Sequence, residues 1–165
     1  MTQKELLEEI QDELQAETWS GGSVVFASSS VKVTQKADLK LAMGSGMRCP
    51  WALIVPGDGQ NDPQHGGQDP NLIIMPVTVI IGVQAAGDAI GEGVLLGANR
   101  VLSTASEGAG IFDILPRVYN AIGRLNTADG VVIQYRQQGE SGSVLLDNNY
   151  IGWRGILYEA MVTVS

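Results

Sequence analysis

The segment from Leu72 to Ala85 constrains the fold more than any other part of this chain of 165 residues. It reads LIIMPVTVIIGVQA and is dense in β-branched residues, which favour strands. Apolar residues occupy both alternating faces, so we expect burial on both sides, by the domain itself or by a neighbouring subunit. Pro76 cannot donate to a neighbouring strand, which favours an edge position or a bulge. An edge strand beside a second subunit would reconcile these features.

Two amphipathic helices are predicted, one on each side of this strand in the sequence. The first spans residues 2–17, where Thr2 and Glu5 fit a capping box. Its apolar residues recur at helical spacing: Leu6, Leu7, Ile10 and Leu14. The second spans residues 113–124, with Pro116 tolerated near its start.

Further strands are predicted at residues 24–33, 51–56, 131–137, 143–147 and 155–164, with a turn at Gly139 to Gly142. Residues 87–110, rich in Gly and Ala, have no clear assignment. No internal repeat or linker divides residues 1–165. We therefore expect one α+β domain: an N-terminal helix, a mostly antiparallel sheet, and a second helix packed on that sheet.

Composition excludes several classes of function. The formal charge of −8 opposes direct capture of nucleic acid, which requires Lys and Arg to neutralise phosphates. One cysteine, Cys49, allows no intrachain disulfide, and one cysteine with one histidine cannot build a zinc site. The polar, acidic N-terminus lacks the regions of a signal peptide, so we expect no export by that route. The longest apolar run, residues 72–83, is about half of what a bilayer-spanning helix requires.

The segment GESGSV, Gly139 to Val144, resembles the nucleophile turn of trypsin-like serine proteases. His65, then Asp88 or Asp113, then Ser141 follow the order of one catalytic triad. However, the chain is too short for the two barrels of such an enzyme, and Gly and Ser are common in hairpin turns. We expect Ser141 to lie in a turn and the protein not to be an enzyme; a small hydrolase using Ser141 is the most distant alternative.

Other motifs that bind ligands are incomplete. Gly91, Gly93 and Gly97 depart from the dinucleotide-binding spacing, and no phosphate-binding loop sequence is present. The loop after Gly57 contains carboxylates and amides, but their spacing departs from that of a calcium-binding loop. Tryptophans and tyrosines are too scattered for a base-stacking platform. We therefore expect no metal and no cofactor.

Taken in order, these segments resemble the tail terminator, or tail completion, proteins of the neck of long-tailed bacteriophages. The resemblance rests on the acidic first helix, CPWALIVPG before a variable loop, PVTVIIGVQA, ILPRVYNAIGRL and the closing GILYEAMVTV. It covers nearly the whole chain and lies in the order of the elements and in the character of their residues, not in an invariant motif. Residues 87–110 are longer than such proteins usually need, which is the clearest departure.

The resemblance implies a structural virion protein, made in the cytoplasm of a bacterial host. Such proteins form a ring, usually of six subunits, that ends polymerisation of the tail tube and joins tail to head through neck or connector proteins. DNA passes through the lumen without specific binding, and an acidic surface suits that passage. Alternatives are a head-tail connector, another minor tail protein, or a protein-binding module that works alone.

Two sets of residues are candidates for contacts. We expect the long strand to lie at the subunit interface, through Val77, Val79, Ile81 and Val83. We expect the loop from Gly57 to Asn71 to contact the tail tube or neck, through Asp58, Asn61, His65 and Gln68.

Overall fold

The structure is a computed structural model that describes residues 1–38, 47–61, 71–86, 91–98, 103–128, 132–146 and 149–164. One six-stranded sheet runs through it, in the order β1-β2-β4-β6-β5, with β3 paired to one end of β4. The strands are β1 (Val31–Val33), β2 (Trp51–Pro56), β3 (Gln60–Asn61), β4 (Leu72–Ala86), β5 (Ile133–Leu146) and β6 (Asn149–Thr163). β1 is parallel to β2, and every other pairing between these strands is antiparallel. The predicted α+β class is confirmed.

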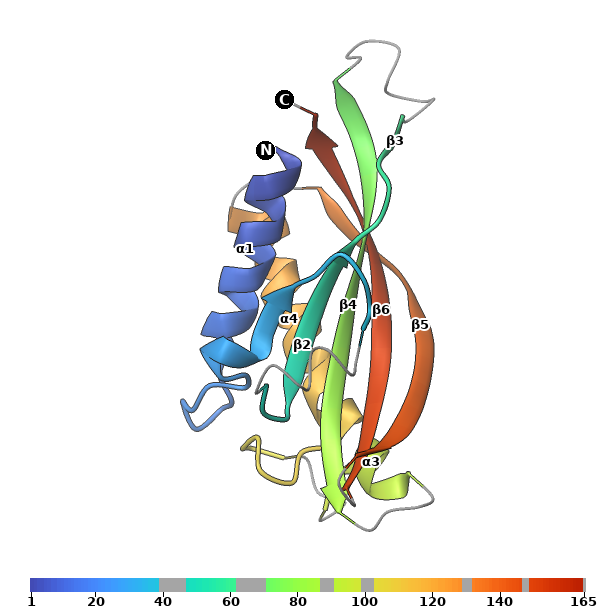
Figure 1. Cartoon of the computed structure of the whole chain (residues 1–165). Coiled ribbons are helices and arrows are strands. Elements are labelled where there is room, and N and C mark those ends of the chain that lie inside the picture. Colours follow the sequence, from blue (N-terminus) through green and yellow to red (C-terminus); the bar gives the residue numbers. More distant parts are fainter. Residues whose placement is uncertain are drawn as a thin grey trace.

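Two long helices, α1 (Gln3–Ala16) and α4 (Ile111–Ala128), lie side by side on one face of the sheet (Figure 1). Their apolar residues, such as Leu6, Ile10 and Ile114, join inward-facing strand residues in one buried cluster. A short helix, α3 (Glu92–Leu96), contacts α4, β4 and β6. The core of the protein is therefore the space between this helical layer and the sheet.

Polar contacts fix the two long helices. Thr2 and Glu5 form the predicted capping box at the start of α1. At its end, the buried carboxylate of Glu17 lies 2.6 Å from Arg124 Nη1 on α4, and Glu13 lies 2.6 Å from Arg124 Nε. At the start of α4, Asp113 accepts hydrogen bonds from the backbone N–H groups of Ser103 and Gly110, each at 2.9 Å. The ion pairs of Arg124 hold α1 against α4. The hydrogen bonds to Asp113 stabilise the start of α4, which begins at Ile111, two residues before the predicted boundary.

β4 is a central strand, so the prediction of an edge strand was wrong. β2 pairs with β4 from Val77 to Gly82, β3 pairs with it at Ile73 and Ile74, and β6 pairs along its whole length. Pro76 falls at the break between β2 and β3, where its carbonyl accepts the N–H of Gly57 at 2.7 Å. The missing N–H of Pro76 therefore faces the interruption of the ladder, which explains how a proline fits inside this sheet.

Several other predicted boundaries were also wrong. In the predicted strand 24–33, only Val31–Val33 is a strand, because Ser28–Ser30 form a turn of 3₁₀ helix. The strands predicted at 131–137 and 143–147 are not separate, because one strand, β5, runs from Ile133 to Leu146, and Gly139 to Gly142 lie within it. The closing strand begins at Asn149 rather than 155, and α4 runs to Ala128 with Pro116 inside it. By contrast, β2 matches the predicted 51–56.

Candidate functional site

The side of the sheet away from α1 and α4 is the candidate site, and we call it the open face. Residues alternate along each strand, so Val79 and Ile81 face the helices, whereas Thr78 and Ile80 face the other side. No described helix covers the open face. Described residues on both sides of 39–46 lie against part of it, since Ala37 lines its cavity and Met47 packs beside Trp51.

Tryptophan and glycine alternate across four strands of the open face. Trp51 on β2 pairs with Gly82 on β4, Gly82 pairs with Trp153 on β6, and Trp153 pairs with Gly142 on β5. Each glycine leaves space for a neighbouring indole: a methyl group on Gly82 would overlap Trp51, and one on Gly142 would lie 2.9 Å from Cζ2 of Trp153. We call this arrangement the Trp–Gly row.

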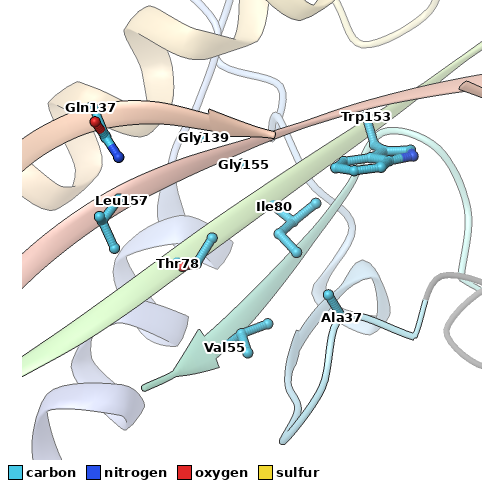
Figure 2. A pocket seen from close by; sticks show the side chains of 9 residues that line it. All are labelled: Ala37, Val55, Thr78, Ile80, Gln137, Gly139, Trp153, Gly155 and Leu157. Carbon is cyan, nitrogen blue, oxygen red and sulfur yellow. The ribbon is translucent and has the colours of Figure 1, made fainter. Parts of the chain in front are cut away.

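A cavity of about 520 Å³ opens beside the Trp–Gly row (Figure 2). One wall is Trp153. The opposite wall consists of three neighbours on adjacent strands: Val55 pairs with Thr78, and Thr78 pairs with Leu157. Between these rows Ile80 pairs with Gly155, which has no side chain and so leaves a hollow. The strand register itself therefore creates the cavity.

The chemistry of the cavity suits binding more than reaction. Its polar side chains are Thr78 and Gln137, neither of which is ionisable, and most of its other lining residues are apolar or glycine. Such a surface fits an apolar group or the face of another protein.

Charge differs between the two sides of the molecule. Lys32 shares a sheet face with Leu53, its pairing partner, and therefore lies on the open face. Lys36 and Arg48 lie in the described segments on this side, together with one acidic residue, Asp38, and all four of these charged residues are exposed. On the opposite side, α1 presents the exposed carboxylates of Glu5, Glu8 and Asp12, together with one cation, Lys4, which lies 3.4 Å from Glu8. The open face thus has a basic margin, and the outer side of α1 is acidic.

The four residues predicted at the subunit interface lie elsewhere. Val77, Val79 and Ile81 have no exposed surface, and Val83 is 2% exposed. All four belong to the cluster that α1 and α4 cover within the same chain. As a correction, these side chains contact the helices of their own subunit and are not available to a neighbour.

The triad residues are not brought together among the described residues. Ser141 is exposed on β5, where it pairs with Arg154 after a bulge, so its predicted position in a hairpin turn was wrong. The carboxylate of Asp113 already accepts hydrogen bonds from the backbone N–H groups of Ser103 and Gly110. His65 and Asp88 lie outside the described residues.

The predicted contact loop is described only at its beginning. Asp58 and Asn61 are exposed, and Asn61 pairs with Ile73 through β3. His65 and Gln68 lie outside the described residues. Within the described ranges, no group of three or more His, Cys, Asp or Glu could hold a metal ion.

Cys49 lies beside the Trp–Gly row, partly buried against the cluster of Trp51 and Leu53. Burial raises the pKa of its thiol to about 11, so it carries no charge at neutral pH. A neutral, shielded thiol is a poor nucleophile, and Cys49 acts as an apolar residue here.

Sequence reasoning missed the open-face cavity. The signal that could have found it is the spacing of Trp153, Gly155 and Leu157, which places a glycine between two large residues on one face of a strand. The pairing partners that turn this spacing into a cavity come from β4, which lies far away in the sequence.

Comparison of the chain with protein-family models found no match, and comparison with curated proteins found none either. Of the helices that the structure describes, none is long and apolar enough to cross a membrane.

Proposed function

We propose that this chain is a structural protein whose copies assemble head to tail into a ring, with α1 of one copy seated on the open face of the next. The observation that carries this proposal is the difference between the two sides: a sheet face with a basic margin and an apolar cavity, and an acidic helix on the opposite side. Two different surfaces in contact make a heterologous interface, which gives a ring when the rotation closes.

Electrostatics favour this arrangement over contact between two open faces. Glu8 and Asp12 of one copy would lie near Lys32 and Arg48 of the next, and opposite charges across an interface steer association. Two open faces would instead bring like charges together. The apolar walls at Val55 and Leu157, which are half-buried in the single chain, would lose their remaining contact with water.

The role that we propose for the ring follows from the sequence resemblance to tail terminators. The ring would cap the tail tube, end its polymerisation and join the tail to neck or connector proteins, as part of the virion. The segment that begins with Asp58 and Asn61 would contact the tube or neck. DNA would pass through a lumen whose acidic surface disfavours binding.

The test is assembly of charge-reversed variants. Light scattering on a sizing column gives the mass in solution, and negative-stain images show the shape. We expect the wild-type chain to form rings and Lys32→Glu/Arg48→Glu to be monomeric. Glu8→Lys/Asp12→Lys should also be monomeric, because its α1 repels a basic margin. An equal mixture of the two variants should form rings again, since each restores the charge opposite the other.

The control is Lys4→Glu, which changes the charge by as much as Lys32→Glu but makes α1 more acidic, because it replaces the cation 3.4 Å from Glu8. It should still assemble. If the mixture stays monomeric while each variant is folded, the proposed contact is wrong. A wild-type chain that is monomeric at all concentrations, also in the presence of purified tail tubes, would favour a protein-binding module that uses the open-face cavity alone.

A further inference from the structure

A second cavity, of about 310 Å³, lies on the other side of the sheet, between α4 and the edge formed by β5 and β6. Three tyrosines line it, Tyr119 from α4, Tyr135 from β5 and Tyr158 from β6, together with Ile122 and Ile133. We call it the tyrosine pocket. It does not involve the open face, so it is independent of the proposed ring contact.

The three rings form a chain of edge-to-face contacts. The centroids of Tyr119 and Tyr135 are 5.4 Å apart with an interplanar angle of 74°, and those of Tyr135 and Tyr158 are 6.1 Å apart at 70°. Aromatic pairs prefer this geometry because the positive edge of one ring meets the negative face of the next. A further ring entering the pocket could extend the same pattern.

One residue of the pocket lining, Tyr158, has a hydroxyl without a partner in the described chain. Tyr158 is only 3% exposed, and its hydroxyl is buried without a hydrogen bond. Two other polar residues of the lining are engaged: Asn126 makes two hydrogen bonds to the backbone of Ile133, and the Tyr119 hydroxyl accepts from Gln138. A buried hydroxyl without a partner is costly, so an oxygen from a ligand at this position would be favoured.

The pocket also has an open side at Gly123. Gly123 lies within α4 and is exposed, and a methyl group built on it meets no atom within 4 Å. The absence of a side chain at this point leaves an entrance.

Burial raises the pKa of the Tyr158 hydroxyl, which keeps it protonated and able to donate.

We propose that the tyrosine pocket binds a single aromatic ring carrying one hydroxyl or carbonyl oxygen. The ring lies among the three tyrosines, and its oxygen accepts the hydrogen bond of the Tyr158 hydroxyl. A phenol is the simplest member of this class, and the tyrosine side chain of a partner polypeptide is another.

The test is binding of p-cresol and of toluene, which lacks the oxygen, measured by saturation-transfer NMR. We expect p-cresol to bind the wild-type protein with a dissociation constant in the millimolar range. In Tyr158→Phe, its affinity should fall by about 3-fold to 10-fold, the value of one hydrogen bond, whereas toluene should bind no more weakly than before. The proposal is overturned if p-cresol does not bind the wild-type protein, or if Tyr158→Phe leaves its affinity unchanged.

A second variant tests the position of the site. Gly123→Leu should fold, because a Cβ at this exposed position meets no atom within 4 Å and leucine favours a helix, and its longer side chain should fill the entrance so that neither compound binds. The matched control is Asn120→Leu, an exposed position of α4 that does not line the pocket and should bind normally. Unchanged binding by Gly123→Leu would place the site elsewhere.

A third probe, N-acetyl-tyrosinamide, separates the two sources of the ring. If it binds as tightly as p-cresol, the entrance admits a polypeptide backbone, and the ligand is a tyrosine of a partner protein. If it is excluded while p-cresol binds, the ligand is a free aromatic compound.

Discussion

Replacing the two glycines of the Trp–Gly row by alanine should have unequal effects on stability. At Gly82 the new methyl group would overlap the Trp51 indole, which has no exposed surface and is enclosed by Leu53 and Ile80. At Gly142 the methyl group would lie 2.9 Å from Trp153, whose ring is only partly buried and can tilt. The two substitutions make the same chemical change against a fixed and a movable neighbour.

The magnitudes follow from these surroundings. Overpacking a buried site costs about 1–3 kcal/mol. Alanine in a strand regains about 0.5–1 kcal/mol relative to glycine, because it loses less backbone entropy on folding. We therefore expect Gly82→Ala to lower the free energy of unfolding by about 2 kcal/mol and Gly142→Ala to change it by less than about 0.5 kcal/mol.

The assay is urea unfolding followed by far-UV circular dichroism, at a concentration where the protein is monomeric. Trp51→Phe provides the matching test, since a smaller ring makes room for the methyl group of Gly82→Ala. The free energy of unfolding of the double variant should be at least about 1 kcal/mol higher than the value expected from adding the effects of the two single substitutions. Equal effects of Gly82→Ala and Gly142→Ala, or additive behaviour of the double variant, would refute the reasoning.

Three further predictions concern the helical layer. Val79→Asp should unfold the protein, because a carboxylate without a partner replaces a side chain with no exposed surface; a folded monomer by circular dichroism would contradict this. Glu17→Gln should lower the free energy of unfolding by about 1 kcal/mol in urea titrations, because the neutral amide weakens the pair with Arg124, which water can still hydrate; no loss would show that the pair is neutral in effect. Hydrogen bonds from Thr2 lower the pKa of Glu5 below 4.5. The ionised carboxylate therefore stabilises α1 above pH 4.5, and this contribution is lost as the pH falls through the pKa of Glu5. On acidification below pH 4.5, Glu5→Gln should lose less helical circular dichroism signal than the wild-type protein.

The sequence predicts the elements whose signals are local. The capping box and apolar spacing of α1 specify its start and its buried face, and the β-branched residues of β2 and β4 specify strands. Boundaries fail where a distant partner decides them. Gly139 to Gly142 have the composition of a turn, but pairing with β6 keeps them in a strand with a bulge.

The candidate sites depend even more on distant partners. Pro76 indicates a local break in a ladder, but only the positions of β2 and β3 show that the break lies inside the sheet. Likewise, the apolar character of Val79 predicts burial without revealing that α1 and α4 provide it. The three tyrosines of the second cavity are separated in sequence and meet only because α4 packs beside β5 and β6.

The distribution of the three tryptophans gives the protein an intrinsic optical reporter of the open face. Trp19 and Trp51 are almost fully buried, so their fluorescence should respond little to a partner. Trp153 is partly exposed at the wall of the open-face cavity, where a covering surface would exclude water from its indole. The emission maximum should therefore shift to shorter wavelength as subunits dock, and the phenylalanine variant of Trp153 should lose this shift. Assembly can thus be followed in real time on the unlabelled protein.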